Sequence, residues 1–212
     1  LYGNLKQFTE SGSGPIKLLR QGEVAIGLAL ITKEVYLSLF AGVFAGSIAI
    51  VKPISFGSLE MFNKQDNLYT VVLRGKENGQ TVNDSRIVTS VSKVMDCKDD
   101  YEDYMGLAKL DTLRFVVSNT TEAGIVLDKN DSMEGLPATY PGKLTKFLYE
   151  RYLTFNGAMD KGLIILPVEL IENNGGKLKE CVLALCDCWE LPAEFKNWVC
   201  EACVFCSTLV DR

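Results

Sequence analysis

The sequence contains no histidine, and this absence excludes several kinds of active site. A chain without histidine cannot form a Ser–His or Cys–His nucleophile pair, and it cannot bind a metal through an imidazole. Proton transfer near neutral pH would therefore fall to a Glu, Asp, Lys, Tyr or Cys side chain whose pKa is shifted by its surroundings. Enzymes whose chemistry depends on a histidine of this chain are thereby excluded.

Positive charge is also scarce, and it does not gather in one place. The chain has 22 Lys and Arg residues against 27 Asp and Glu residues, which gives a net charge of −5. No basic stripe is present, so the electrostatic footprint of a nucleic-acid-binding protein is missing. A negative charge of this size favours solubility and does not identify a partner.

A secretory signal is lacking, although the chain has seven cysteines. An odd number of cysteines without such a signal predicts free thiols in a reducing compartment, and we expect a cytoplasmic protein. Cys200, Cys203 and Cys206 have the spacing of three iron–sulfur ligands. Their apolar neighbours favour instead small buried side chains on a regular helix, and we expect no metal site.

Only one apolar run is long enough to raise the question of a membrane span. Residues 35–51 carry no charge, and their number just reaches that of the shortest membrane-spanning helix. Gly42, Gly46 and Ser47 divide the run into a helix-like half and a strand-like half. No aromatic belt or positive flank accompanies it, so we expect no membrane span.

Strands and helices alternate along most of the chain. Strands are expected at residues 16–21, 47–51, 115–117 and 162–167, and the run 115–117 is typical of a strand buried on both faces of a parallel sheet. Helices are expected at residues 24–40, 99–110, 142–155 and 175–188, with a helical turn at 59–64 and a last helix from Pro192 that reaches Phe205. Strands at 68–74 and 81–91, joined by a turn at 75–79, predict an antiparallel hairpin.

This order predicts an α/β fold with a Rossmann-like, doubly wound, mostly parallel sheet that carries the antiparallel hairpin as an insertion. Helices would cover both faces of the sheet. Residues 1–15 are expected to form a flexible lead-in, and residues 16–212 the dinucleotide-binding domain.

Two polar clusters follow predicted strands, at the carboxyl ends where ligands bind in an open α/β sheet. The first is Ser118 with Asn119, Thr120, Thr121 and Glu122. These residues suit either a ligand shelf or a loop that satisfies free backbone groups.

The second cluster holds paired acids and paired amides, among them Glu169 and Asn174. Such side chains suit the recognition of a polyol or sugar acid. Capping of the following helix by asparagine explains them equally well.

The turn after the first predicted strand departs from the pattern of a dinucleotide-binding turn. The turn contains Gly22, Glu23, Val24 and Ala25: Gly22 is its first glycine, and Val24 stands where a second glycine would let the backbone approach a pyrophosphate. The branched side chain of Val24 would obstruct that approach. Lys52 stands where a carboxylate normally holds the adenosine ribose, and a lysine there favours a 2′-phosphate. These residues leave the choice between NAD and NADP open.

Several segments, in order along the chain, resemble one family. They are residues 65–70 (QDNLYT), 118–124 (SNTTEAG), 140–145 (YPGKLT), 155–157 (FNG) and 205–212 (FCSTLVDR). Together they resemble the N-terminal half of the tagaturonate reductases, or altronate oxidoreductases, within the mannitol dehydrogenase family. The likeness runs from about Ile48 to Arg212.

The resemblance implies a Rossmann domain that binds NAD, followed in the family by a helical domain that completes the active site. It implies reversible reduction of the small sugar acid tagaturonate to altronate, in cytoplasmic hexuronate breakdown. By position, residues 118–122 would line the nicotinamide side, while Glu169 and Asn174 would face the substrate. The catalytic residues would lie beyond Arg212, so we expect cofactor binding without turnover from residues 1–212.

Two alternatives remain open. One is a noncatalytic Rossmann module that has lost its cofactor, which the residue at Val24 favours. The other is a different polyol or sugar-acid dehydrogenase of the same family. The sequence does not determine the oligomeric state.

Overall fold

The computed structural model describes residues 48–53, 59–77 and 79–208, which fall within one compact unit, Ser47–Arg212. The predicted lead-in at 1–15, the strand at 16–21, the turn at Gly22–Ala25 and the helix at 24–40 lie outside these residues. Most of the uncharged run 35–51 lies outside them as well. Among the described helices, none combines the length and the apolar character needed to span a bilayer.

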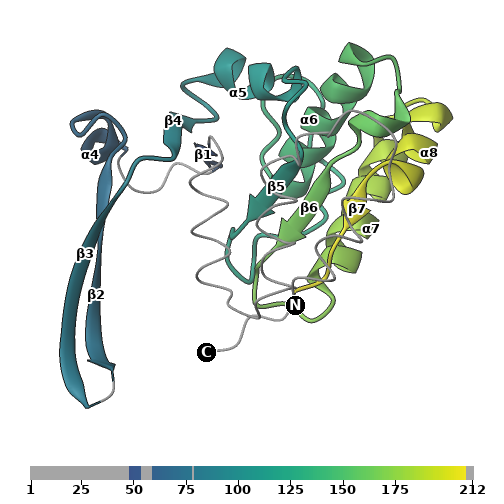
Figure 1. Cartoon of the computed structure of the whole chain (residues 1–212). Helices are drawn as coiled ribbons and strands as arrows, with labels where there is room; N and C mark the ends of the chain where they lie inside the picture. The colour runs from purple at the N-terminus through teal and green to yellow at the C-terminus, as the bar shows by residue number, and fades with distance from the viewer. Residues whose placement is uncertain (1–47, 54–58, 78, 209–212) are drawn as a thin grey trace, which may run out of the picture. The chain divides into compact units, whose positions relative to one another are not determined.

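A three-stranded parallel sheet contains β5 (Phe115–Ser118), β6 (Ile164–Pro167) and β7 (Val204–Phe205), in that order (Figure 1). A second parallel pair joins β1 (Ile48–Lys52) to β4 (Val91–Asp96).

The pairing of these strands can be compared with the strand order of a Rossmann sheet. If the predicted strand 16–21 is counted as the first strand and the hairpin is left out, the five described strands are the second to the sixth. A Rossmann sheet with order 3-2-1-4-5-6 pairs its third strand with its second, its fourth with its fifth and its fifth with its sixth, and the five described strands show these pairings. The mostly parallel, Rossmann-like α/β sheet is confirmed.

The predicted hairpin is present as β2 (Tyr69–Glu77) and β3 (Gln80–Val88). Glu77 pairs with Gln80, so the connecting loop is two residues long and the predicted five-residue turn is wrong. Gly79 in this loop has a φ of +82°, a conformation that glycine adopts at low cost. Within the described residues no third strand pairs with either edge of the hairpin.

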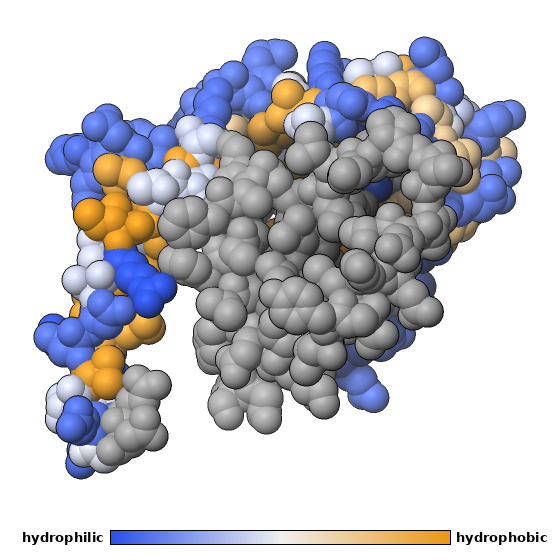
Figure 2. All heavy atoms as spheres, viewed as in Figure 1, coloured by the Kyte–Doolittle hydropathy of each residue, from blue (hydrophilic) through white to orange (hydrophobic). Residues whose placement is uncertain are grey.

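Apolar side chains remain exposed along this hairpin. Val72 is 50% exposed and Ile87 is 66% exposed, and charged residues such as Arg74 and Asp84 lie within three positions of them in the sequence. Figure 2 shows these mixed hydrophobic and hydrophilic side chains on the hairpin.

The strand predicted at 81–91 is β3, but its predicted end lies three residues too far along the chain, and β4 was not predicted. β3 ends at Val88, and β4 begins at Val91 and pairs with β1. Only Thr89 and Ser90 separate the two strands, and two polar residues are too short a break to mark a boundary in the sequence. The buried side chains of Val91, Val94 and Met95 show that β4 belongs to the parallel pair.

The helices lie close to their predicted positions. They are α4 (Glu60–Asn63), α5 (Tyr101–Ala108), α6 (Tyr140–Thr154), α7 (Asn174–Cys188) and α8 (Ala193–Glu201), with a 3-10 turn η1 (Met159–Lys161). The last helix is shorter than predicted: it ends at Glu201, and the chain then forms β7.

Three of these helices cover one face of the β5–β6–β7 sheet. Ile165 on β6 is fully buried among Leu148 of α6, Val182 of α7 and Val199 of α8 in a single apolar cluster. On the neighbouring strand Val117 is 64% exposed, so the expected burial on both faces is wrong for this position of β5. The apolar face of α6 and its start next to Pro141 are confirmed.

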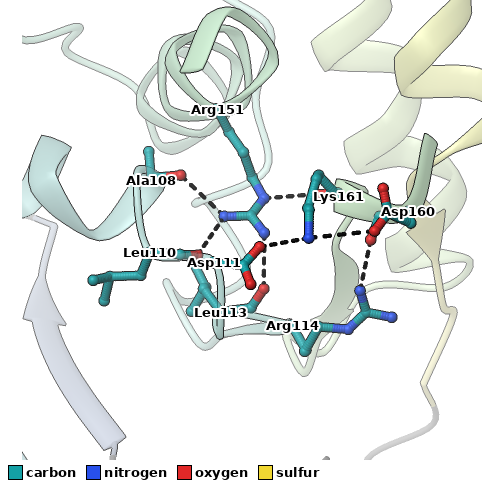
Figure 3. Close-up of polar contacts among 8 residues, drawn as sticks. All are labelled: Ala108, Leu110, Asp111, Leu113, Arg114, Arg151, Asp160 and Lys161. Atoms are coloured by element: carbon teal, nitrogen blue, oxygen red, sulfur yellow. Dashed lines mark hydrogen bonds and ion pairs between the residues drawn. The ribbon is translucent and has the colours of Figure 1, made fainter. Parts of the chain in front are cut away.

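A buried arginine joins the elements that lead into β5 and β6. Arg151 of α6 has no exposed surface, and its guanidinium donates to four backbone carbonyls (Figure 3). The acceptors are Ala108 at 3.0 Å, Leu110 at 2.9 Å, Leu113 at 3.0 Å and Lys161 at 2.6 Å. Because a buried carbonyl without a donor is costly, this one side chain fixes the end of α5, the segment before β5 and the turn before β6.

Replacing Arg151 with lysine tests this role. An ammonium cannot reach four carbonyls arranged around a planar guanidinium, so Arg151→Lys should lower the free energy of unfolding by about 3 kcal/mol or more. Urea denaturation followed by circular dichroism measures the loss. Arg114→Lys is the matched control, since Arg114 donates one hydrogen bond of 2.8 Å to the carbonyl of Asp160, and it should cost less than about 1 kcal/mol. Equal losses in the two variants would contradict the prediction.

Candidate functional site

The carboxyl ends of β5 and β6 lie side by side. Ser118, the last residue of β5, pairs with Pro167, the last residue of β6, and the Val168 amide donates to the Ser118 carbonyl at 2.8 Å. The two polar clusters that follow these strands therefore meet at one edge of the sheet. The sequence placed them at strand ends, and the parallel register brings them together.

Glu169 forms the bridge between the two clusters. Its carboxylate is 1% exposed. It accepts hydrogen bonds from the Ser118 hydroxyl at 3.2 Å, from the Thr120 hydroxyl at 2.9 Å and from the Thr120 amide at 3.0 Å. A buried carboxylate is tolerated where donors surround it, and here all three donors come from the chain that leaves β5.

Asn174 anchors the same edge from the other side. It is the first residue of α7 and has no exposed surface. Its amide nitrogen donates to the carbonyls of Pro167 and Glu169, each at 3.0 Å, and its oxygen accepts from the Gly175 and Thr208 amides at 2.8 and 3.0 Å. Both polar atoms of this side chain are thus bound within the chain.

The start of α7 also packs tightly against the chain that follows β7. A Cβ added to Gly175 would lie 2.6 Å from the carbonyl carbon of Cys206, which leaves no room for a side chain. Glycine is therefore required at this position for close backbone approach.

The loop after Ser118 lines an open hollow of about 420 Å³. Its walls are Asn119, Thr121, Glu122, Ala123 and, from the segment after β6, Leu170. Thr121 has a φ of +75°, a conformation that a β-branched residue adopts only when its surroundings enforce it. Of the ten predicted cofactor-binding residues, three line this hollow: Asn119, Thr121 and Glu122. Two others, Ser118 and Thr120, form hydrogen bonds with Glu169.

Two buried tyrosine hydroxyls near α6 differ in their partners. The Tyr104 hydroxyl donates to the Lys143 carbonyl at 3.1 Å. The Tyr140 hydroxyl is buried beside the Ser118 side chain, but within the described part of the chain it forms no hydrogen bond of good geometry. Burial raises the pKa of both tyrosines, so both are protonated at neutral pH.

Lys52 forms an ion pair at the end of the other parallel sheet. Its ammonium lies 2.7 Å from the carboxylate of Asp96, the last residue of β4. The hydrogen bond from Lys52 is the main reason that the pKa of Asp96 lies below its usual value. The sequence did not indicate this pairing, because β4 was not recognised.

All seven cysteines are free thiols, as predicted. Cys200 is exposed on α8, whereas Cys203 is buried and Cys206 follows β7, so the three do not share one helix. Burial raises the pKa of Cys203 to about 11. Across the described residues, no group of three or more acidic or cysteine side chains could hold a metal ion.

The four remaining predicted cofactor-binding residues, Gly22, Glu23, Val24 and Ala25, lie outside the described residues, so their role stays a prediction. Tyr140 and Thr208 lie beside the site, although neither was predicted as a site residue. Both stand in segments that carry the family resemblance, 140–145 and 205–212, but no motif or spacing shows which residues of these segments contact the strand ends.

The two tyrosines provide a matched pair of variants. Tyr140→Phe removes a buried hydroxyl that has no hydrogen bond of good geometry, so the free energy of unfolding should stay unchanged or rise by up to about 1 kcal/mol. Tyr104→Phe removes a hydrogen-bonded hydroxyl and should lower it by about 1 kcal/mol. Urea denaturation of both variants gives the comparison, and a larger loss for Tyr140→Phe would show that its hydroxyl has a partner.

Comparison with curated proteins finds relatives named altronate oxidoreductase. The protein from Bacillus subtilis (strain 168) is 49% identical over 170 residues, which are 80% of this chain and 35% of that protein. The protein from Bacteroides thetaiotaomicron is 47% identical over 170 residues, which are 80% of this chain and 36% of that protein. The chain thus spans about a third of the length of these curated relatives.

Among solved structures, the fold is similar to Pseudomonas fluorescens mannitol 2-dehydrogenase in a ternary complex with NAD and D-mannitol. The TM-score is 0.58 at 19% identity, and the match covers 92% of this chain and 39% of that one. The sequence profile described as the mannitol dehydrogenase Rossmann domain matches residues 19–212. On this match and the identity to its curated relatives, the chain belongs to the mannitol dehydrogenase family.

Proposed function

We propose that this chain is the cofactor-binding part of an NAD-dependent oxidoreductase that interconverts tagaturonate and altronate. The observation that carries the proposal is the shared edge of β5 and β6, where two polar strand ends adjoin an open hollow. The name of the relatives that are 45–49% identical supports altronate as the substrate class. The reaction is proposed for a complete protein of the relatives' length, acting on a small sugar acid in cytoplasmic hexuronate breakdown.

In this proposal the loop of residues 118–122 receives the nicotinamide end of the cofactor. The cofactor supplies hydride transfer when bound, and the chain supplies binding and orientation. The strand ends of a doubly wound sheet suit this task, because ligands bind outside the carboxyl ends of its strands. The hollow beside Thr121 and Glu122 offers a surface for it.

Glu169 and Asn174 were expected to contact substrate oxygens, and that role stays a prediction. Both side chains are buried, and their polar atoms already bind groups of this chain. A substrate would reach them only if these contacts opened. Their present geometry supports a role in shaping the edge of the sheet.

The ion pair at Lys52 supports NAD over NADP. A free lysine at the end of this strand would attract a 2′-phosphate. Here the carboxylate of Asp96 lies 2.7 Å from the ammonium and neutralises much of its charge. An acidic group at this place would also repel a phosphate.

A second candidate is a Rossmann module without a cofactor. The specific observation in its favour is Val24, which stands where a dinucleotide-binding turn has its second glycine. This candidate accounts for the fold equally well, and the two differ only in ligand binding.

Titration of the protein with NADH, followed by the fluorescence of the dinucleotide, separates the two candidates. We expect a saturable change. Val24→Gly should strengthen binding, because it removes a branched side chain from the expected pyrophosphate turn. If wild type and Val24→Gly both give no saturable signal, the chain does not bind the cofactor and the proposal fails.

The preference for NAD can be tested at the ion pair. Wild type should bind NADH more tightly than NADPH. Asp96→Asn should lower the ratio of the two affinities by roughly tenfold, because it removes the carboxylate that offsets the charge of Lys52 and repels a phosphate. Asp103→Asn is the control of equal charge change, since Asp103 pairs on the surface with Lys93 at 2.6 Å. An equal change in both variants would indicate a general effect of net charge.

A further inference from the structure

We propose that Glu169 is a positioning residue, which holds the loop after β5 in the conformation that receives the cofactor. The inference rests on the proposed function and adds to it a residue that acts through Ser118 and Thr120, without touching the cofactor itself.

The loop needs such a support. Thr121 has a φ of +75°, in the left-handed region that β-branched residues avoid. Three residues further, at Gly124, the chain passes so close to Thr120 that an added Cβ would collide with the Thr120 hydroxyl. A backbone in this state persists only where surrounding contacts hold it.

Glu169 supplies contacts at the residue just before the strained position. One carboxylate oxygen accepts both the amide and the hydroxyl of Thr120, at 3.0 and 2.9 Å. The other oxygen accepts the hydroxyl of Ser118 at 3.2 Å. Hydrogen bonds to a buried carboxylate are stronger than those between neutral groups, so they hold the start of the loop firmly.

The backbone of Glu169 is itself held in place by Asn174. The backbone of Glu169 accepts a hydrogen bond of 3.0 Å from Asn174, which also binds the Pro167 carbonyl at the end of β6. The chain of contacts therefore runs from the first turn of α7, through Asn174 and Glu169, to Thr120. It ends at the loop residues that line the hollow.

The consequence for binding follows from the fraction of molecules with an ordered loop. When only part of a population has the competent conformation, the apparent affinity falls by that fraction. Loss of the Glu169 carboxylate should therefore weaken cofactor binding by loosening the loop, while the core cluster under the sheet stays intact.

Four variants of the protein, each titrated with NADH, test the inference. Glu169→Ala removes all three acceptor contacts and should weaken binding by roughly tenfold or more. Glu169→Asp keeps the charge on a side chain that is one methylene too short, and it should weaken binding similarly. Glu169→Gln keeps an acceptor of the right length and should stay within about threefold of wild type. Glu172→Ala, an exposed acid in the same segment, is the control and should bind as wild type does.

Hydrogen exchange of the amides of residues 119–124 supplies a readout that does not depend on NADH. Exchange should accelerate in Glu169→Ala and Glu169→Asp, and not in Glu172→Ala, with protection in α6 and α7 retained. Unchanged loop exchange, or unchanged NADH affinity in Glu169→Ala and Glu169→Asp, would overturn the inference alone. A wild type that fails to bind NADH would overturn the proposed function, and the cofactor role of Glu169 with it.

Discussion

The parallel register between β5 and β6 is the constraint on which the site depends. It sets Ser118 directly beside Pro167, so the two chains leave the sheet at the same level. A shift of one residue would turn every side chain of a strand to the opposite face and separate Glu169 from its donors. At the other end of the same strands, Arg151 binds the backbone that enters β5 and the turn that enters β6. Buried polar contacts thus fix these strands at both ends.

Sequence reasoning predicted the fold well where local pattern and tertiary packing agree. The apolar spacing on α6, with Leu144, Phe147 and Leu148, and the proline at its start gave a helix that the core confirms. It failed where strand boundaries depend on pairing. β3 was extended to Val91 and β4 was missed, since the two residues between them carry no turn signal, and their separation arises from different partners, β2 for β3 and β1 for β4. β7 was read as helix because its two residues follow an amphipathic segment without a break.

The candidate site shows a similar division. The rule that ligands meet strand ends placed residues 118–122 and Glu169 at one edge, and the register confirms that they adjoin. Which side chains face the solvent and which face inward could not be read from the sequence. Asn174 looked like a ligand-binding amide, yet its capacity is taken by four backbone groups contributed by residues between 167 and 208. Such long-range partners are set by the fold, because no spacing in the sequence encodes them.

The long hairpin has a consequence for how the protein behaves among copies of itself. Within the described residues no third strand pairs with either outer edge of the hairpin, and Val72 and Ile87 are exposed. A ribbon of this kind can template further strands, a route to aggregation that proteins block with charge. Arg74, Asp84 and Arg86 interrupt the apolar residues here and act as gatekeepers. The charged residues of the hairpin therefore oppose aggregation of the protein, independently of any role in cofactor or substrate binding.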